Sequence, residues 1–264
     1  MKTNPVRAKL KRGEASLGAW LVLPDPFAAR LMSSVGFDWL NVELEHAPVN
    51  IETAAACFVA IAAGGAVPLA RVPFNTVENI KRVLDNGAWG VVVPMVNSRA
   101  EAEAAVAAAR YQPLGQRSVG GQLHAVSFGA DPATYYARAN DEILLVVMIE
   151  HVRAVEDAEA ILSVPGVDAF FIGPNDLTNS MGRPPVFESD DPEFTQALRH
   201  LLAVGRKYGV ASGIHVADAA AAARRRAEGF QMIAIASDAG LMLAKARESL
   251  AALGLGAGAL VAKY

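Results

Sequence analysis

The sequence has a single cysteine, Cys57, among its 264 residues, so no disulfide can form within the chain. A zinc site built from several cysteines is excluded for the same reason. No stretch of about 18 apolar residues free of charge is present, so we expect no membrane-spanning helix. The basic N-terminus also lacks the apolar segment of a secretory signal. These absences predict a cytoplasmic protein.

Neither sign of charge dominates the chain. Lys and Arg number 24 and Asp and Glu number 27, which gives a net charge of −3. A protein that binds nucleic acid or an anionic membrane usually carries an excess of basic residues, so neither partner is expected. With 53% hydrophobic and 19% charged residues, the chain is too apolar to be disordered. The composition therefore predicts a folded globular protein.

Short apolar segments alternate with amphipathic, alanine-rich segments along the chain. Eight segments are predicted as strands because they are almost continuously apolar, as parallel strands covered on both faces are: 16–23, 38–43, 66–71, 89–95, 143–149, 168–172, 209–214 and 231–236. Eight segments are predicted as helices: 25–35, 51–63, 76–86, 98–110, 154–162, 192–208, 217–228 and 238–253.

Eight βα units in about 250 residues predict a (β/α)8 TIM barrel that forms one α/β domain over 1–264. The alternative is an open doubly wound sheet, which often has a glycine-rich turn after its first strand. Here that position holds Pro24-Asp25-Pro26, which cannot cradle a dinucleotide. The longest irregular stretch, 111–140, is expected to be a functional lid.

The active site of such a barrel lies at the C-terminal ends of its strands. Glu150 and Asp176 follow the fifth and sixth strands, which are neighbours in the barrel. Two carboxylates there repel each other unless a cation or a shared proton lies between them. They therefore predict a site for a hard divalent metal with open positions for a chelating 2-oxo acid. The alternative is that each carboxylate caps a helix or pairs with an arginine.

Three further groups lie at predicted strand ends. Arg71 can polarise a ketone and stabilise an enolate, or form a structural ion pair with Glu43 or Glu45. His46 with Glu43 can form an acid–base couple in which the carboxylate orients the imidazole, although a lone histidine is more often structural. Gly173-Pro174-Asn175-Asp176 can bind a substrate carboxylate through backbone amides, or be an ordinary turn.

Lysine is absent from every predicted strand end. The seven lysines are Lys2, Lys9, Lys11, Lys81, Lys207, Lys245 and Lys263. An aldolase that forms a Schiff base needs a lysine in the barrel mouth, so carbon–carbon chemistry here should depend on a metal.

Taken together, the segments FDWLNVELEHAP, PLARVP, GAWGVVVPMVNS, VVMIEH and GVDAFFIGPNDLTNSMG resemble the HpcH/HpaI aldolases, over roughly 16–253. The resemblance implies a (β/α)8 barrel with one divalent metal ion (Mg²⁺, Mn²⁺ or Co²⁺) on Glu150 and Asp176. It also implies that Arg71 binds the 2-oxo group and that His46 serves acid–base chemistry. Finally, it implies a hexamer built from dimers that exchange their last helix, with Asp85 reaching a neighbouring subunit's site.

Five positions depart from the family pattern. The family usually has Asp in place of Glu43, Gln in place of Met148 and a small hydroxyl residue in place of His151. An arginine is common near His124, and a smaller or aliphatic residue is common at His215. These departures put the acceptor side of the pocket, and therefore the substrate, in question.

The function expected from these residues is cleavage or formation of a 4-hydroxy-2-oxo acid, to or from pyruvate or a close 2-oxo acid such as hydroxypyruvate and an aldehyde. One alternative is an acyl-CoA lyase of the citrate-lyase type, although no basic cluster for the CoA phosphates is seen. The other is a barrel that binds 2-oxo acids without catalysis. The apolar end of the chain, about 238–264, including Leu250, Leu253, Leu255, Leu260 and Val261, is expected to pack on a partner subunit.

Overall fold

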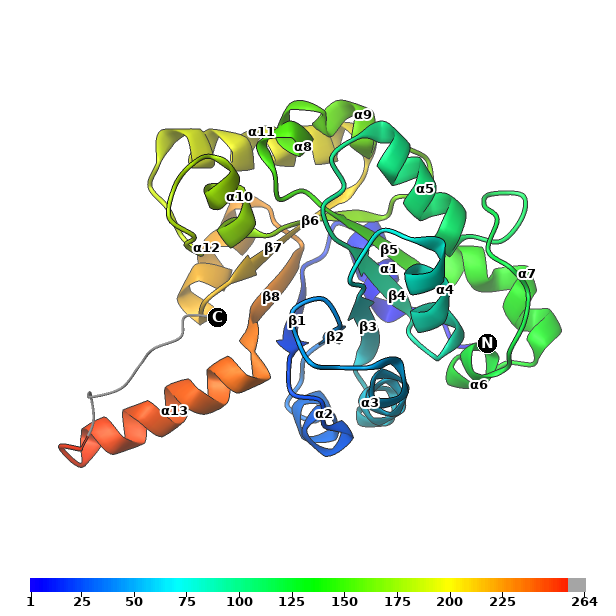
Figure 1. The fold of residues 1–264 in the computed structure, drawn as a ribbon, viewed down its shortest axis with the longest axis horizontal. Helices are drawn as coiled ribbons and strands as arrows, with labels where there is room; N and C mark the ends of the chain where they lie inside the picture. Colours follow the sequence, from blue (N-terminus) through cyan, green and yellow to red (C-terminus); the bar gives the residue numbers. More distant parts are fainter. Residues whose placement is uncertain (256–264) are drawn as a thin grey trace.

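The computed structural model describes residues 1–255 as a closed barrel of eight parallel strands in the order β1 to β8, with helices outside it (Figure 1). The strands are β1 (Ser16–Leu21), β2 (Trp39–Glu43), β3 (Val67–Arg71), β4 (Gly90–Val93), β5 (Leu144–Met148), β6 (Ala169–Ile172), β7 (Ala211–Val216) and β8 (Met232–Ser237). Each strand overlaps one of the eight predicted segments, so the (β/α)8 fold class is confirmed.

The predicted helices correspond to α2 (Pro26–Ser33), α3 (Ile51–Gly64), α4 (Val77–Asp85), α5 (Arg99–Ala109), α8 (Val152–Glu156) with α9 (Ala158–Leu162), α11 (Pro192–Tyr208), α12 (Ala219–Glu228) and α13 (Asp238–Ala252). Four helices lie outside the predicted segments: α1 (Pro5–Lys11), α6 (Leu123–Ser127), α7 (Pro132–Glu142) and α10 (Pro174–Ser180). The segment 111–140 is therefore not wholly irregular. Asp131 caps α7 by accepting a hydrogen bond from the backbone N–H of Thr134, with Pro132 in the first turn.

Alternate residues of each strand point into the barrel, and glycines make room there for large side chains. A Cβ on Gly18 would lie 2.1 Å from the Trp39 ring, and one on Gly213 would lie 2.5 Å from the Phe171 ring. Trp39 and Phe171 pack edge to face, with ring centroids 6.4 Å apart. The barrel interior thus contains packed aromatic side chains, together with the buried amide of Asn41, which lies on the same face of β2 as Trp39.

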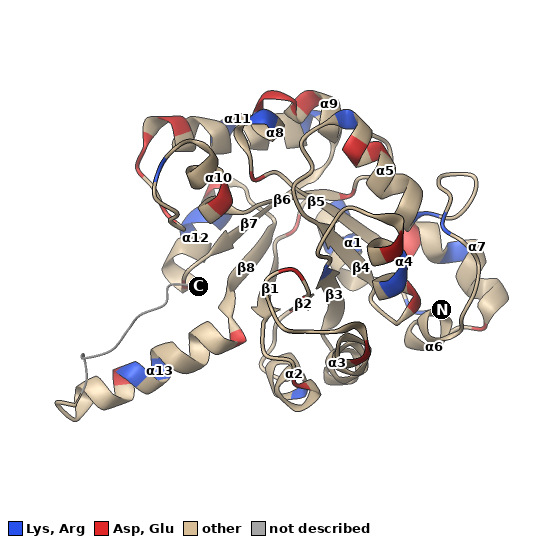
Figure 2. Cartoon of the chain, in the orientation of Figure 1, with Lys and Arg blue, Asp and Glu red and all other residues tan. Residues whose placement is uncertain are grey.

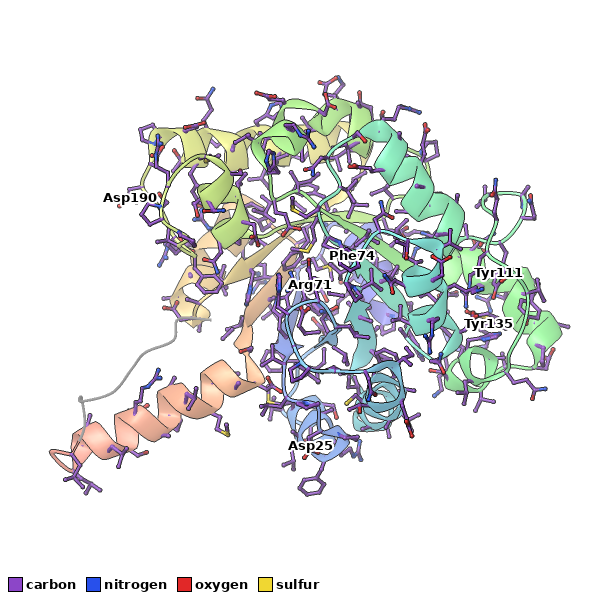
Figure 3. The ribbon with its side chains drawn as sticks, viewed as in Figure 1. Asp25, Arg71, Phe74, Tyr111, Tyr135 and Asp190 are labelled. Atoms are coloured by element: carbon purple, nitrogen blue, oxygen red, sulfur yellow. The ribbon has the colours of Figure 1, made fainter. Side chains whose placement is uncertain are left out.

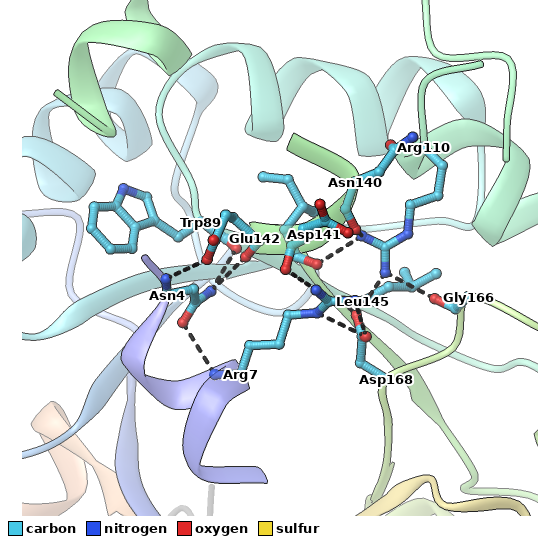
Figure 4. A network of polar contacts seen from close by, with 11 residues as sticks. Asn4, Arg7, Trp89, Arg110, Asn140, Asp141, Glu142, Leu145, Gly166 and Asp168 are labelled. Carbon is cyan, nitrogen blue, oxygen red and sulfur yellow. Dashed lines mark hydrogen bonds and ion pairs between the residues drawn. The ribbon is translucent and has the colours of Figure 1, made fainter. Parts of the chain in front are cut away.

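The end of the barrel where the strands begin is closed by a network of ion pairs and hydrogen bonds (Figure 4). The guanidinium of Arg110 is 2.6 Å from Oδ2 of Asp168, and that of Arg7 is 2.7 Å from Oδ1. Asn4 caps α1 and also donates from Nδ2 to the carbonyl oxygens of Trp89 and Glu142. These contacts attach α1 across the bottom of the barrel.

The last helix, α13, extends away from the barrel (Figure 1). Only Asp238, at its start, is buried, whereas Leu241, Met242, Leu243 and Leu250 are exposed. The predicted tail residues Leu260 and Val261 lie outside the described residues. Acidic and basic residues are interspersed on the outer helices, such as α5 and α13 (Figure 2). Within residues 1–255, no helix is both long enough and apolar enough to cross a membrane.

Candidate active site

Glu43 and Arg71 form a buried ion pair at the mouth of the barrel, where strands β2 and β3 end. The two residues are paired in register, and Nε of Arg71 donates to Oε2 of Glu43 at 2.6 Å. The same Nε lies 3.2 Å from Oε2 of Glu45. Burial lowers the pKa of Arg71, but the Glu43 and Glu45 carboxylates outweigh that effect and raise it above its ordinary value. Arg71 therefore carries a fixed positive charge into the mouth (Figure 3).

The guanidinium of Arg71 is also held by an aromatic ring. Its Cζ lies 4.6 Å from the centroid of the Trp20 ring, a cation–π contact, and Nη1 is 3.8 Å from the sulfur of Met148. Because Nε is engaged by the two glutamates, the terminal nitrogens are the donors left for a ligand. The structure thus contains the ion pairs with Glu43 and Glu45 that were the alternative interpretation of Arg71. The Arg71 guanidinium also lies at the mouth of the barrel, where its terminal nitrogens could donate to an oxygen of a substrate.

His46 lies at the rim of the mouth with 65% of its side chain exposed. The predicted contact between its imidazole and the Glu43 carboxylate is not found within residues 1–255. Oε1 of Glu43 instead accepts hydrogen bonds from the backbone N–H groups of Glu45 and His46, at 2.6 and 3.0 Å. The carboxylate near the imidazole is that of Glu45, 3.9 Å from Nε2.

Glu150 lies two residues after the end of β5 and is almost completely buried, and only one of its carboxylate oxygens is hydrogen-bonded. Oε1 accepts from the backbone N–H of Met95 at 2.8 Å, while Oε2 has no partner among the described residues. A Cβ on Gly173 would lie 2.5 Å from that Oε2, so only glycine leaves the oxygen uncrowded. Burial raises the pKa of Glu150 to about 7, and the negative charge of Asp176 adds to the shift. The positive charge of Arg71 lowers the pKa but does not offset burial, so the ionised carboxylate still has neither a hydrogen-bond donor nor a bound cation at Oε2.

Gly173 is the N-cap residue of the short helix α10, with Pro174 in its first turn. Asp176 follows in the same turn and its side chain is exposed, whereas Asn175 is half-buried. No side chain caps the first backbone amides of this helix. The structure does not gather three or more His, Cys, Asp or Glu side chains into one potential metal site within residues 1–255. Any ion held by Glu150 and Asp176 would thus have only these two carboxylates, leaving positions for water and substrate.

Asp85, at the end of α4, is not brought to the mouth of its own barrel. Its Oδ1 accepts from Nη2 of the buried Arg117 at 2.6 Å. That guanidinium lies over the Tyr111 ring, 4.7 Å from its centroid, and donates to the Tyr135 hydroxyl at 3.2 Å. Tyr135 belongs to α7 and Tyr111 packs against it, and both lie well away from Arg71 (Figure 3). The predicted role of Asp85 in a neighbouring subunit's site stays a prediction.

The structure adds residues to the mouth that were not among the predicted site residues. Glu45 contacts both Arg71 and His46, and Trp20 contacts the Arg71 guanidinium. Burial raises the pKa of Glu45 above its ordinary value. Trp20 could have been found from alternation: it lies on the same face of β1 as Gly18, which points into the barrel.

The histidines that depart from the family pattern have different environments. His151 caps α8, because its Nδ1 accepts from the backbone N–H of Arg153 at 3.1 Å. His124 is buried against Tyr135, with ring centroids 4.4 Å apart, and burial lowers its pKa. His215 alone of the three lies at a strand end in the barrel mouth, near Trp20.

Comparison with known proteins identifies the family to which this chain is similar. The family model described as HpcH/HpaI aldolase/citrate lyase matches residues 16–244. The chain is 38% identical to a hydroxypyruvate/pyruvate aldolase of Chromohalobacter salexigens over 248 residues, which cover 94% of this chain and 96% of that protein. It is also 38% identical to a 4-hydroxy-2-oxo-heptane-1,7-dioate aldolase of Escherichia coli, over 94% of each protein.

A solved structure supports the same assignment. The crystal structure of an HpcH/HpaI aldolase/citrate lyase family protein from Burkholderia cenocepacia matches with a TM-score of 0.89 and 34% identity, over 96% of this chain and all of that one. The resemblance seen in the sequence motifs is thereby confirmed: the chain belongs to the HpcH/HpaI aldolase/citrate lyase family.

Proposed function

We propose that this protein is a divalent-metal-dependent aldolase, a carbon–carbon lyase that joins or releases pyruvate, or a close 2-oxo acid such as hydroxypyruvate, and an aldehyde. The observation that carries the proposal is the unpaired buried oxygen of Glu150 beside Gly173, in the same barrel mouth as Arg71. Family membership and the names of the relatives support the reaction class. The 4-hydroxy-2-oxo acid is the cleaved substrate.

The residues present fit a hard divalent cation. Glu150 presents an oxygen that has no hydrogen-bond donor among the described residues, and Asp176 adds a second carboxylate from the next βα unit. Oxygen ligands of this kind suit Mg²⁺, Mn²⁺ or Co²⁺, one ion per subunit. When bound, the ion supplies a Lewis acid for the 2-oxo group. A cation would also remove the cost of ionising Glu150 in a buried position.

Arg71 binds the oxygen that becomes negatively charged as the enolate forms. Its charge is fixed by Glu43 and Glu45, and its plane is fixed by Trp20, so the terminal N–H groups are already oriented. Preoriented donors stabilise developing charge without the reorganisation that water requires. Glu43 therefore acts by holding Arg71 and the backbone of the segment that carries His46.

His46 accepts the proton of the substrate's 4-hydroxyl during cleavage and returns it during addition. Its exposed position at the rim leaves the imidazole accessible to an aldehyde entering from solvent, with Glu45 as the nearest carboxylate. The backbone amides of Asn175 and Asp176, at the start of α10, bind the substrate carboxylate. Pro174 has no N–H and serves to start the helix after Gly173.

Deuterium exchange at the methyl group of pyruvate tests metal dependence and enolate formation together. Metal-stripped protein should not exchange the methyl protons of pyruvate with deuterium, and added Mn²⁺, Co²⁺ or Mg²⁺ should restore the exchange in NMR spectra. Borohydride with pyruvate should leave the enzyme active, because no strand end carries a lysine. Inactivation by borohydride would indicate a Schiff base.

Metal binding without exchange would favour a non-catalytic binding barrel, and cleavage of an acyl-CoA alone would favour the lyase alternative.

We also propose that the protein is a hexamer, a trimer of dimers in which α13 packs on a partner. The exposed leucines of α13 would form an unusually apolar surface on a helix that extends from its own barrel. Asp85 would then contribute to a partner's site. Truncation after Leu250 should dissociate the hexamer and reduce activity. A fully active full-length monomer in light scattering would contradict this assembly.

A further inference from the structure

His215 lies in the barrel mouth and has no part in the function proposed above. Gly213, two residues earlier on β7, points into the barrel toward Phe171. Strand side chains alternate, so His215 points inward as well. Ile172 of β6 is paired in register with Ile214, which places His215 level with Gly173. The imidazole therefore belongs to the same layer of the mouth as the unpaired oxygen of Glu150.

Aromatic rings hold the imidazole on two sides. The Trp20 ring, which also carries the Arg71 guanidinium, has its centroid 5.6 Å from that of His215. Phe187, from the segment between α10 and α11, meets the imidazole edge to face at 4.9 Å and 80°. His215 and Arg71 thus share one wall of the mouth, with Trp20 in contact with both.

The hydrogen bond of the imidazole fixes which ring nitrogen carries the proton. Nε2 lies 3.2 Å from the carbonyl oxygen of Ala236. A carbonyl oxygen can only accept, so Nε2 must donate and Nδ1 is left with a free lone pair. Within residues 1–255, Nδ1 has no hydrogen-bond partner, and it is not among the polar atoms shielded from solvent. Burial lowers the pKa of His215 to about 4, so this acceptor stays neutral at physiological pH.

An acceptor in this wall faces the carbon chain of a bound 2-oxo acid. With Arg71 on the oxygen of C2, as proposed above, C3 is the next carbon, and Trp20 and His215 form the wall beside Arg71 that a group on C3 would meet. A methyl group there would leave Nδ1 unpaired when water is displaced, whereas a hydroxyl group would donate to it. Sites that hydrogen-bond a substrate hydroxyl discriminate strongly against the analogue that lacks it.

We propose that His215 is a specificity-determining residue that accepts, through Nδ1, a hydrogen bond from a hydroxyl group on C3 of the 2-oxo acid. The protein thereby prefers a hydroxylated donor, such as hydroxypyruvate, over pyruvate. This inference rests on the proposed aldolase function.

The test measures deuterium exchange at C3 of hydroxypyruvate and of pyruvate, with Mn²⁺ present and no aldehyde, above the rates without enzyme. His215→Leu should lower the ratio of kcat/KM for hydroxypyruvate to that for pyruvate about 10- to 100-fold. His215→Asn, which keeps an acceptor oxygen, should recover part of the ratio. His200→Leu, on the exposed face of α11, is the matched control and should leave the ratio unchanged.

An unchanged ratio in folded His215→Leu and His215→Asn would overturn the role of His215 while leaving the aldolase function intact. A change that depends only on the aldehyde, glycolaldehyde against acetaldehyde in the complete reaction, would overturn the placement of the hydroxyl on C3. If the unmodified protein exchanges neither donor, the aldolase function itself fails, and the specificity role fails with it.

Discussion

Charged side chains are buried at both ends of this barrel, but their hydrogen bonding differs. At the bottom, both oxygens of Asp168 are paired with arginines, and Oδ2 also accepts from the backbone N–H of Leu145 (Figure 4). At the mouth, Glu150 has one oxygen without a partner among the described residues. A buried carboxylate oxygen without a partner is costly, and a cation bound beside it offsets that cost. Asp168 is therefore a fully paired structural carboxylate, whereas Glu150 keeps one oxygen for the metal ion of the proposed function.

The largest expected effect on stability is at the bottom of the barrel. Asp168→Asn leaves the buried guanidinium of Arg110 and that of Arg7 without a counter-charge. Breaking a buried pair in this way costs about 3–5 kcal/mol. Urea unfolding should show that loss, while kcat per folded molecule stays near that of the unmodified protein. A fall in kcat without a fall in stability would contradict the claim that the bottom network is structural and the mouth functional.

At the mouth, Arg71 should matter for turnover more than for folding. Arg71→Ala removes a preoriented donor, and losing one such donor costs about 10²–10³ in rate. The Glu43 carboxylate then loses its partner, so some stability is lost as well. Arg71→Lys, which keeps the charge beside Glu43, is the matched variant and separates the two losses. Near-normal turnover by folded Arg71→Ala would remove Arg71 from the mechanism.

The pH dependence of stability should report the unpaired carboxylate of Glu150. Its pKa is about 7 in the folded metal-free protein, above the ordinary value of 4.5. Between these two values the folded state holds a proton that the unfolded state has lost, so stability falls as pH rises, by up to about 3 kcal/mol. Glu150→Gln should abolish that fall when urea unfolding is compared at pH 5 and pH 8. An identical pH dependence in both proteins would show that Glu150 ionises without cost.

The smallest effect is expected at Cys57, which lies in the core and belongs to neither end. Burial raises the pKa of its thiol to about 11, so almost no thiolate forms near neutral pH. Iodoacetamide at pH 8 should leave the native protein active and unlabelled by mass spectrometry. Labelling of native protein would show that the packing around α3 opens readily.

The strands were predictable because each is a short apolar run, and the barrel order follows from repeated βα units. The candidate site residues could also be predicted, because the active site of such a barrel lies at the C-terminal ends of the strands. The sequence offered both Arg71 and His46 as partners of Glu43 and could not decide between them, and it gave no sign that two backbone amides also donate to this carboxylate. Rotamers and neighbouring packing decide such competition, and neither is visible in local sequence.

The network at the bottom was missed for a related reason. Arg110 is the last residue of a predicted helix, and Asp168 is the first residue of a predicted strand. Their contact joins residues 58 positions apart, and that of Arg7 with Asp168 joins residues 161 positions apart. Nothing in either local segment indicates the other, so only the folded chain shows that both oxygens of Asp168 are paired.

The most direct test of the contrast between the ends is calorimetric titration of the metal-stripped protein with Mn²⁺. One ion should bind per subunit, and both Glu150→Gln and Asp176→Asn should weaken that binding strongly. Glu248→Gln, which removes an exposed carboxylate on α13, should leave it unchanged. Equal Mn²⁺ affinity in Glu150→Gln and the unmodified protein would contradict the claim that the unpaired oxygen at the mouth is a metal ligand.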